Sequence, residues 1–257
     1  MSTKMTTSTA RFAAIEGAGP IKVLVLHGWA LDSGVWLAAR ARSNTRDFTW
    51  AYFDFPAYGV NRALEPAAGI DGMARAALAA VDEHLGWTSF AVLGHSMGGA
   101  TAMRVATLRP HAVTAVAALT PVSPAGTPLD AATFAGFDGA WADPAAAIKG
   151  FLSPGIDDGD LRRLVDRNRA AMERPTWTAY LKNWTSPDFM PALADYPGPV
   201  TLFYGQTDPF VNEAYLAETA RNLRRGRLVG IPVAGHYPMI ETVEASQSAV
   251  ESALRTT

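Results

Sequence analysis

The sequence predicts an α/β protein, with a mainly parallel central sheet, helices on both faces of the sheet, and a helical insertion. Two observations indicate this class. Short apolar runs alternate with longer stretches in which apolar residues recur at helical spacing. The alternation is interrupted once, over residues 122–194, where no strand pattern is present.

The predicted strands are short, continuously apolar and followed by turn-forming residues, which is typical of parallel strands covered on both faces. They are Ile21 to Leu26, Trp50 to Phe53, Phe90 to Leu93, Val113 to Leu119, Val200 to Tyr204 and Arg227 to Val233. The predicted helices lie between the strands and contain few helix-breaking residues. They are Ile70 to Leu85, Met97 to Leu108, Glu213 to Leu223 and Glu241 to Leu254.

The interrupted stretch is predicted to be a helical cap, residues 122–194, on a core formed by residues 1–121 and 195–257. It contains several prolines and two helical pieces, Asp160 to Met172 and Thr176 to Asn183. Its many aromatic residues either form a small core of the insertion or line an apolar pocket beneath a lid. The candidate substrate-binding residues of this stretch are Trp141, Trp177 and Trp184.

Composition narrows the classes of function. The chain has 257 residues, 49% of them hydrophobic, which predicts one well-buried domain. Its formal net charge of −2 creates no overall electrostatic field that would attract nucleic acid or an anionic membrane. The absence of cysteine excludes disulfides, thiolate metal sites and a cysteine nucleophile. No apolar run approaches the roughly 20 residues that span a bilayer. Met1 to Ala10 lacks the apolar core of a secretory signal, so we expect a loose tail on a cytoplasmic protein.

The strongest chemical signal is the segment Gly94-His95-Ser96-Met97-Gly98-Gly99, which satisfies G-x-S-x-G. It stands between a predicted strand and a predicted helix, the context in which such a serine occupies a tight turn with its hydroxyl projecting from the sheet. The small residues on either side let the neighbouring backbone approach closely. Ser96 is therefore the predicted nucleophile.

A serine hydroxyl needs a base, and the base needs a group that holds it in the correct tautomer. His236 follows the last predicted strand and is the predicted base, because a solvated or packing role accounts for the other histidines. Asp208 follows the strand before it and is the predicted acid, in preference to Asp188 and Asp195, which lie too close to the insertion. Serine, aspartate and histidine then occur in the chain order known for this kind of architecture.

Two backbone N–H groups are predicted to stabilise the oxyanion that forms on the attacked carbonyl. They belong to Trp29, in the loop after the first predicted strand, and to Met97, directly after the nucleophile. The Trp29 ring either walls the pocket or anchors the packing. Tyr237, next to the predicted base, is a further candidate substrate-binding residue.

Five landmarks in order make the chain resemble the α/β-hydrolase superfamily from Ile21 to Leu254. They are Leu26-His27-Gly28-Trp29, Asp54-Phe55-Pro56-Ala57-Tyr58-Gly59, Gly94-His95-Ser96-Met97-Gly98-Gly99, Gly205-Gln206-Thr207-Asp208-Pro209 and Gly235-His236-Tyr237-Pro238. The resemblance implies the α/β-hydrolase fold, with the insertion as its helical cap. Tyr58 departs from the serine that the family often has. The segment Leu26 to Trp36 is also similar to the esterases that cleave pimeloyl-carrier-protein methyl ester, but only locally.

Within that superfamily, the resemblance favours a carboxylic ester hydrolase acting on a small to medium, largely neutral substrate through an acyl-enzyme. Ser96 stands where epoxide hydrolases and haloalkane dehalogenases carry aspartate, which disfavours both. A carbon–carbon bond hydrolase or a lactonase remains an alternative, although the former typically has tryptophan where Tyr237 stands. A non-catalytic ligand receptor is a further, less favoured alternative.

The expected partner is a small-molecule ester, and neither nucleic acid nor a membrane is expected as a partner. No metal-ligand spacing and no phosphate-binding loop is present, so no cofactor is expected. The arginines of the cap could dock an acidic partner, but aspartates alternate with them, which favours a solvated helix face with local charge pairs.

Overall fold

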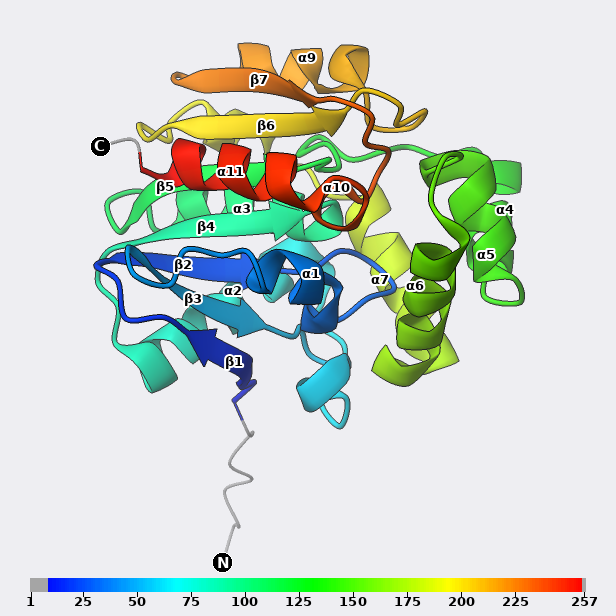
Figure 1. Ribbon diagram of the computed structural model, residues 1–257, viewed down its shortest axis with the longest axis horizontal. Helices are drawn as coiled ribbons and strands as arrows, with labels where there is room; N and C mark the ends of the chain where they lie inside the picture. The colour runs from blue at the N-terminus through cyan, green and yellow to red at the C-terminus, as the bar shows by residue number, and fades with distance from the viewer. Residues whose placement is uncertain (1–8, 256–257) are drawn as a thin grey trace, which may run out of the picture.

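The computed structural model describes residues 9–255, and its strands form one seven-stranded sheet in the order β1-β3-β2-β4-β5-β6-β7 (Figure 1). The edge strand β1 runs antiparallel to β3, and every other neighbouring pair is parallel. The strands are β1 (Phe12–Glu16), β2 (Ile21–Leu26), β3 (Phe48–Phe53), β4 (Phe90–His95), β5 (Val113–Leu119), β6 (Val200–Gly205) and β7 (Gly226–Ile231). The predicted α/β class is thus confirmed, while residues 1–8 of the predicted tail lie outside the described residues.

Three strand predictions differ from the structure. The sequence analysis missed β1, whose residues are only partly buried because it lies at the sheet edge. It began β3 two residues late, at Trp50, although Phe48 and Thr49 already pair with β2. It extended β7 to Val233, but this residue has a φ of 63° and is 78% exposed, so the strand ends at Ile231.

Helices cover both faces of the sheet, as expected for parallel strands. One face carries α2 (Gly69–Ala80), α3 (Met97–Leu108) and α9 (Glu213–Arg221), and the other carries α1 (Leu37–Arg40) and α11 (Val243–Leu254). Strand β2 shows why two cores result, because Leu24 and Leu26 point into the first layer while Val23 and Val25 point into the second. A π-helical turn over Val81–Leu85 follows α2.

The helix predicted over Glu241 to Leu254 begins two residues later in the structure, as α11, and a separate short helix, α10 (Pro238–Glu241), precedes it. Thr242 separates them with a φ of −141°, which is incompatible with a continuous helix. The short helix α10 directly follows the loop that carries His236.

Between β5 and β6, residues 122–194 form helices, and most of them lie beyond the carboxyl ends of the strands (Figure 1). They are α4 (Ala131–Gly139), α5 (Pro144–Ala147), a π-helical turn over Ile148–Leu152, α6 (Asp158–Ala171), α7 (Arg174–Thr185) and α8 (Met190–Leu193). Helix α8 packs against α3 of the core.

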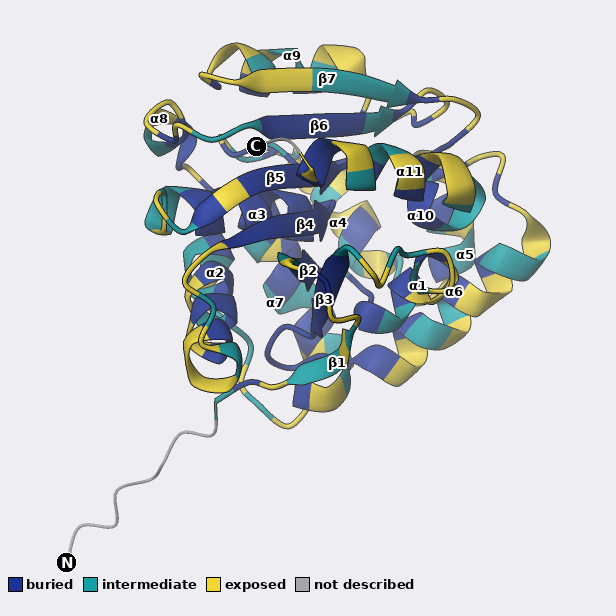
Figure 2. Ribbon diagram, turned by 60° about the vertical axis from the view of Figure 1, so that its left-hand side comes forward, coloured by how far each residue is buried: buried dark blue, intermediate teal, exposed yellow. Residues whose placement is uncertain are grey.

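Figure 2 shows how burial differs between the sheet and the insertion. The central strands are buried, whereas the outer faces of α5 and α6 are exposed. Among the cap arginines, Arg163 pairs with Asp160 on the same helix, which is the local kind of pair that was predicted. Arg167 pairs instead with Asp32 of the core, and Arg174 pairs with Asp138 on α4. Within residues 9–255, no helix has both the length and the hydropathy needed to cross a membrane.

Candidate active site

Ser96 occupies a strained turn between β4 and α3. Its φ of 52° and ψ of −116° lie outside the regions that L-residues favour, and its N–H donates to the Leu119 carbonyl at 2.9 Å. The flanking glycines are required by close backbone contacts. A Cβ on Gly94 would stand 2.1 Å from the Gly98 carbonyl oxygen, and one on Gly98 would stand 2.3 Å from the His27 carbonyl oxygen. The turn thus tolerates no side chain at either position.

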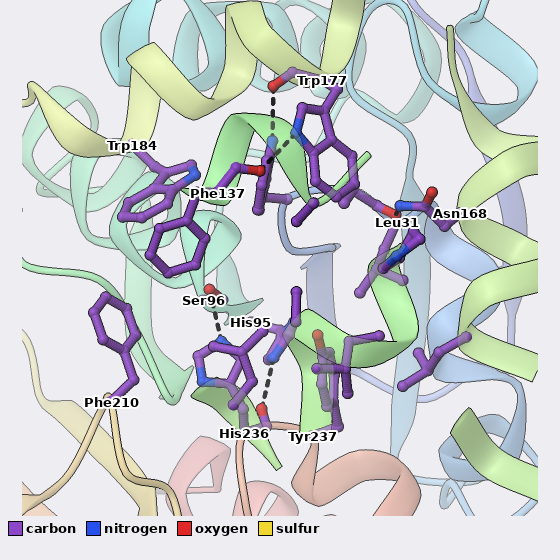
Figure 3. Close-up of a pocket in the computed structure, with 18 of the residues that line it drawn as sticks. Leu31, His95, Ser96, Phe137, Asn168, Trp177, Trp184, Phe210, His236 and Tyr237 are labelled. Atoms are coloured by element: carbon purple, nitrogen blue, oxygen red, sulfur yellow. Dashed lines mark hydrogen bonds between the residues drawn. The ribbon is translucent and has the colours of Figure 1, made fainter. Parts of the chain in front are cut away.

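Ser96, His236 and Asp208 form one chain of hydrogen bonds. The Ser96 Oγ lies 3.0 Å from His236 Nε2, and His236 Nδ1 lies 2.7 Å from Asp208 Oδ2 (Figure 3 draws the first of these contacts). Their exposed fractions are 8%, 3% and 3%, so the chain is shielded from bulk water. With Nδ1–H donating to the carboxylate, Nε2 is the ring nitrogen that can accept the serine proton.

Asp208 is held by its own backbone turn. Its Oδ1 accepts the N–H groups of Phe210 at 2.8 Å and Val211 at 3.0 Å, which leaves Oδ2 for the imidazole. The rival Asp195 lies instead on the surface near Arg224, at 3.7 Å. Of the three aspartates considered, Asp208 is therefore the one that the structure brings to His236.

The backbone of His236 is fixed on both sides. Its N–H donates to the Ser153 Oγ at 2.8 Å, and to the Leu152 carbonyl at 3.1 Å, both from the cap segment. Its carbonyl accepts the Thr120 hydroxyl at 3.0 Å and lies 2.9 Å from His95 Nε2. The cap thus contributes directly to the position of the predicted base.

A carboxylate closes the loop around His236. Glu241 on α10 accepts the N–H of Gly235 at 3.0 Å and the N–H of Tyr237 at 2.8 Å, the two residues that flank the histidine. The same carboxylate accepts the Ser153 hydroxyl at 2.9 Å. Neither Ser153 nor Glu241 was singled out from the sequence, because nothing in their local pattern relates them to position 236.

Of the two residues whose N–H groups are predicted for the oxyanion, Met97 directly follows Ser96, and Trp29 lines the same cavity as Ser96. Among the described residues, neither group donates to a backbone or side-chain acceptor. The loop of Trp29 is fixed by His27, whose Nδ1 contacts the Gly28 carbonyl oxygen at 2.8 Å and whose Nε2 accepts the Phe55 N–H at 3.1 Å. Backbone N–H groups without an acceptor in the protein can receive a developing negative charge.

His27 and His95 are uncharged supports of the site. Burial lowers the pKa of His27, with nearby Asp54 opposing the shift, and burial lowers the pKa of His95 well below its usual value, with His236 adding to the shift. Both rings are buried and hydrogen-bonded. The packing role considered for them from the sequence can therefore be specified. His27 holds the backbone at Phe55, and His95 holds the backbone at His236.

An apolar cavity opens on Ser96 beneath the cap (Figure 3). The predicted binding residues Trp29, Trp177, Trp184 and Tyr237 line it. Burial raises the pKa of the Tyr237 phenol, so this ring is neutral near pH 7. Sequence reasoning did not assign to the pocket several further residues that line it, among them Leu31, Ile148, Leu164, Asn168 and Phe210.

Trp141 does not line the cavity, which corrects its prediction as a substrate-binding residue. Its ring packs against Trp177, with 5.7 Å between centroids, and the Arg169 guanidinium covers it at 4.2 Å. Its role in the structure is packing within the cap.

No group of three or more His, Cys, Asp or Glu side chains within residues 9–255 is placed to hold a metal ion. The features that could take part in a reaction are the Ser96–His236–Asp208 chain, the N–H groups of Trp29 and Met97, and the apolar cavity. This arrangement can support nucleophilic attack on a carbonyl carbon.

Comparison with known proteins gives relatives that span nearly the whole chain. Pimeloyl-[acyl-carrier protein] methyl ester esterase of Pectobacterium carotovorum subsp. carotovorum is 27% identical over 254 residues, which cover 90% of this chain and 92% of the relative. The protein of the same name from Nitrosomonas europaea is 27% identical over 243 residues, covering 89% of this chain and 93% of the relative.

Solved structures share the fold at lower identity. The bromoperoxidase from Bacillus anthracis superposes with a TM-score of 0.83 at 19% identity, covering 95% of this chain and 94% of the other. The enol-lactonase from Burkholderia xenovorans LB400 gives 0.82 at 20% identity, covering 95% of both chains. The model of the alpha/beta hydrolase family matches residues 23–246. The chain therefore belongs to the alpha/beta hydrolase family.

Proposed function

We propose that this protein hydrolyses carboxylic esters of small to medium, largely neutral substrates through an acyl-enzyme. The observation that carries the proposal is the buried hydrogen-bond chain from Ser96 through His236 to Asp208, which opens into an apolar cavity. The relatives at 27% identity, named as methyl ester esterases, support an ester as the substrate class.

The mechanism follows from the positions of the atoms. His236 Nε2 takes the proton of Ser96 as Oγ bonds to the ester carbonyl carbon, and Asp208 stabilises the imidazolium. The carbonyl oxygen becomes an oxyanion facing the N–H groups of Trp29 and Met97. The C–O bond to the alcohol then breaks, with the proton passing from His236 to the leaving oxygen. Water, deprotonated by His236, attacks the acyl-enzyme, and the acid leaves as Ser96 regains its proton.

The cavity lining supports a neutral substrate. Its described lining residues include no Asp, Glu, Lys or Arg, and aromatic and aliphatic side chains predominate. An apolar wall gains free energy by covering apolar substrate surface, whereas an unpaired charge in the same place loses its hydration. We therefore expect esters with neutral acyl chains of short or medium length to be hydrolysed faster than esters with charged acyl chains.

The test is hydrolysis of p-nitrophenyl esters from acetate to long acyl chains by the native protein and by Ser96→Ala. Turnover that disappears in the variant would support the proposal, and the chain length with the highest kcat/KM would measure the pocket. If both proteins are equally inert, the ester hydrolase proposal fails, and dienones and lactones become the substrates to try. Labelling by a fluorophosphonate would then separate a reactive serine from a non-catalytic pocket.

A further inference from the structure

The two backbone groups of His236 are held by different parts of the protein. Its N–H donates to the Ser153 Oγ at 2.8 Å and to the Leu152 carbonyl at 3.1 Å, and within residues 9–255 both of its acceptors belong to the cap. Its carbonyl is held by Thr120 and His95, which belong to the core. One side of the predicted base therefore depends on a segment that lies 83 residues away in the sequence.

The segment that holds this N–H also forms part of the cavity wall. It begins with the π-helical turn Ile148–Leu152, and the side chains of Ile148 and Leu152 line the cavity. Ser153 ends the turn, because its own N–H donates to the Ile148 carbonyl at 2.8 Å. Ser153 is fully buried and is not among the lining residues. π-Helical turns are rare and frequently occur at functional sites. Adjacent residues of one turn thus wall the cavity and hold the base.

The Ser153 hydroxyl is used both as a donor and as an acceptor. A carboxylate only accepts hydrogen bonds, so the hydroxyl proton points to Glu241, at 2.9 Å between oxygens. The lone pairs of the same oxygen then receive the N–H of His236. The fit is close, since a Cβ on Gly235 would stand 2.5 Å from this oxygen. Alanine at position 153 could serve neither contact, whereas threonine could serve both.

We propose that Ser153 is a positioning residue for the reaction at Ser96. It fixes the main chain at His236, and the main chain in turn determines whether the ring reaches Ser96 Oγ at 3.0 Å and Asp208 Oδ2 at 2.7 Å. This inference rests on the proposed ester hydrolysis. It extends that function, because the cap then supplies part of the geometry of the reacting groups as well as the walls of the pocket.

The kinetic test compares Ser153→Ala and Ser153→Thr with the native protein on p-nitrophenyl acetate, butanoate and octanoate. A displacement of roughly 1 Å can lower a rate about 100-fold, and the Leu152 carbonyl still accepts the N–H, so kcat/KM of the alanine variant should fall about tenfold. The factor should be the same for all three esters, because Ser153 does not line the cavity. Threonine should recover most of the lost rate. A factor that changes with chain length would place the effect in substrate binding and overturn the inference.

Thr127→Val is the matched control. Thr127 is also a buried cap residue, and its hydroxyl contacts the core, 2.6 Å from the Tyr215 hydroxyl on α9. Valine keeps the shape of threonine and removes this contact between cap and core. The control should leave kcat/KM unchanged. If it loses as much activity as Ser153→Ala, the loss reflects docking of the cap in general, and the positioning role is refuted.

Two measurements apply even if no ester is hydrolysed. A fluorophosphonate reacts with Ser96 when His236 takes the serine proton, so the labelling rate constant of Ser153→Ala should also fall about tenfold. The proton between His236 Nδ1 and Asp208 Oδ2 should give a ¹H signal downfield of the amide protons, assigned by its loss in His236→Ala. That signal should broaden in Ser153→Ala, because the ring is less firmly held.

These two measurements need only the alanine variant, so they remain decisive if threonine does not fit at position 153. Labelling of Ser153→Ala at the native rate, with an unchanged ¹H signal, would overturn the inference. Slower labelling by a protein that is inert towards every ester would support the positioning role of Ser153 and refute ester hydrolysis.

Discussion

Replacing Glu241 by alanine should loosen the loop that carries His236 without touching any reacting atom. The Glu241 carboxylate accepts the N–H groups of Gly235 and Tyr237 and the hydroxyl of Ser153, at 2.8 to 3.0 Å. Those three donors surround the histidine in sequence or in space. Alanine removes all three acceptor contacts at once.

The magnitude follows from these bonds. A hydrogen bond to a charged group contributes about 1.5 to 3 kcal/mol, and part of the loss at Glu241 is recovered by water because the carboxylate is only partly buried. We therefore expect the free energy of unfolding to fall by about 2 to 4 kcal/mol. Since a displacement of roughly 1 Å can lower a rate about 100-fold, kcat/KM should fall by about 10- to 100-fold.

The assay combines urea unfolding with hydrolysis of p-nitrophenyl acetate. Glu241→Gln should lie between the native protein and alanine, because its amide oxygen still accepts one N–H while its NH2 opposes the other. The matched control is Glu244→Ala on α11, whose side chain is 77% exposed and pairs with Arg42 at 2.9 Å. This control should change stability by less than about 0.5 kcal/mol. If Glu241→Ala behaves like Glu244→Ala in both measurements, the positioning role assigned to Glu241 is refuted.

Three further predictions concern the nucleophile turn, the acid and the buried histidines. Asp208→Asn should lower kcat about 10⁴-fold with an unchanged circular dichroism spectrum, because the imidazole loses its tautomer control; near-native turnover would contradict this. Gly98→Ala should lower both the unfolding midpoint and kcat, since its Cβ would meet the His27 carbonyl oxygen at 2.3 Å, whereas Gly136→Ala, with open space around it, should stabilise α4 by about 0.5 to 1 kcal/mol. Stability should fall as pH drops below the unfolded histidine pKa of 6.5, and it should go on falling until pH reaches the lowered folded pKa of His27 and of His95, because over that range the unfolded rings bind protons that the buried ones do not. Equal urea midpoints at pH 7 and pH 5.5 would contradict that assignment.

The sequence was sufficient for the order of the main elements and for the three residues of the hydrogen-bond chain. Ser96, Asp208 and His236 each follow a strand pattern, and the carboxyl ends of parallel strands meet at one edge of the sheet. Local pattern and topology together therefore brought distant residues to one place. The strained turn at Ser96 was also predictable, because glycines mark positions where the backbone approaches closely.

Other features depend on contacts that no local pattern encodes. The edge strand β1 is short and partly buried, so its residues lack the continuous apolar character of the inner strands. Trp141 and Trp177 are both tryptophans of the insertion, yet only the packed structure shows that Trp177 lines the cavity and that Trp141 packs against it without lining the cavity. The sequence identified the aromatic residues of the insertion as candidates, but it could not tell which of them line the cavity.

By itself, then, the sequence determined the fold class and pointed to the three residues that the structure joins by hydrogen bonds, because their signals lie within single strand-and-turn segments. Only the tertiary structure decided which residues surround these three and hold them in place. Ser153 and Glu241 meet around the His236 loop although 88 residues separate them, and Asn168 and Trp184 are left unpaired only because cap and core enclose them. Hydrogen bonding and burial of this kind are properties of the packed chain, so no local sequence pattern predicts them.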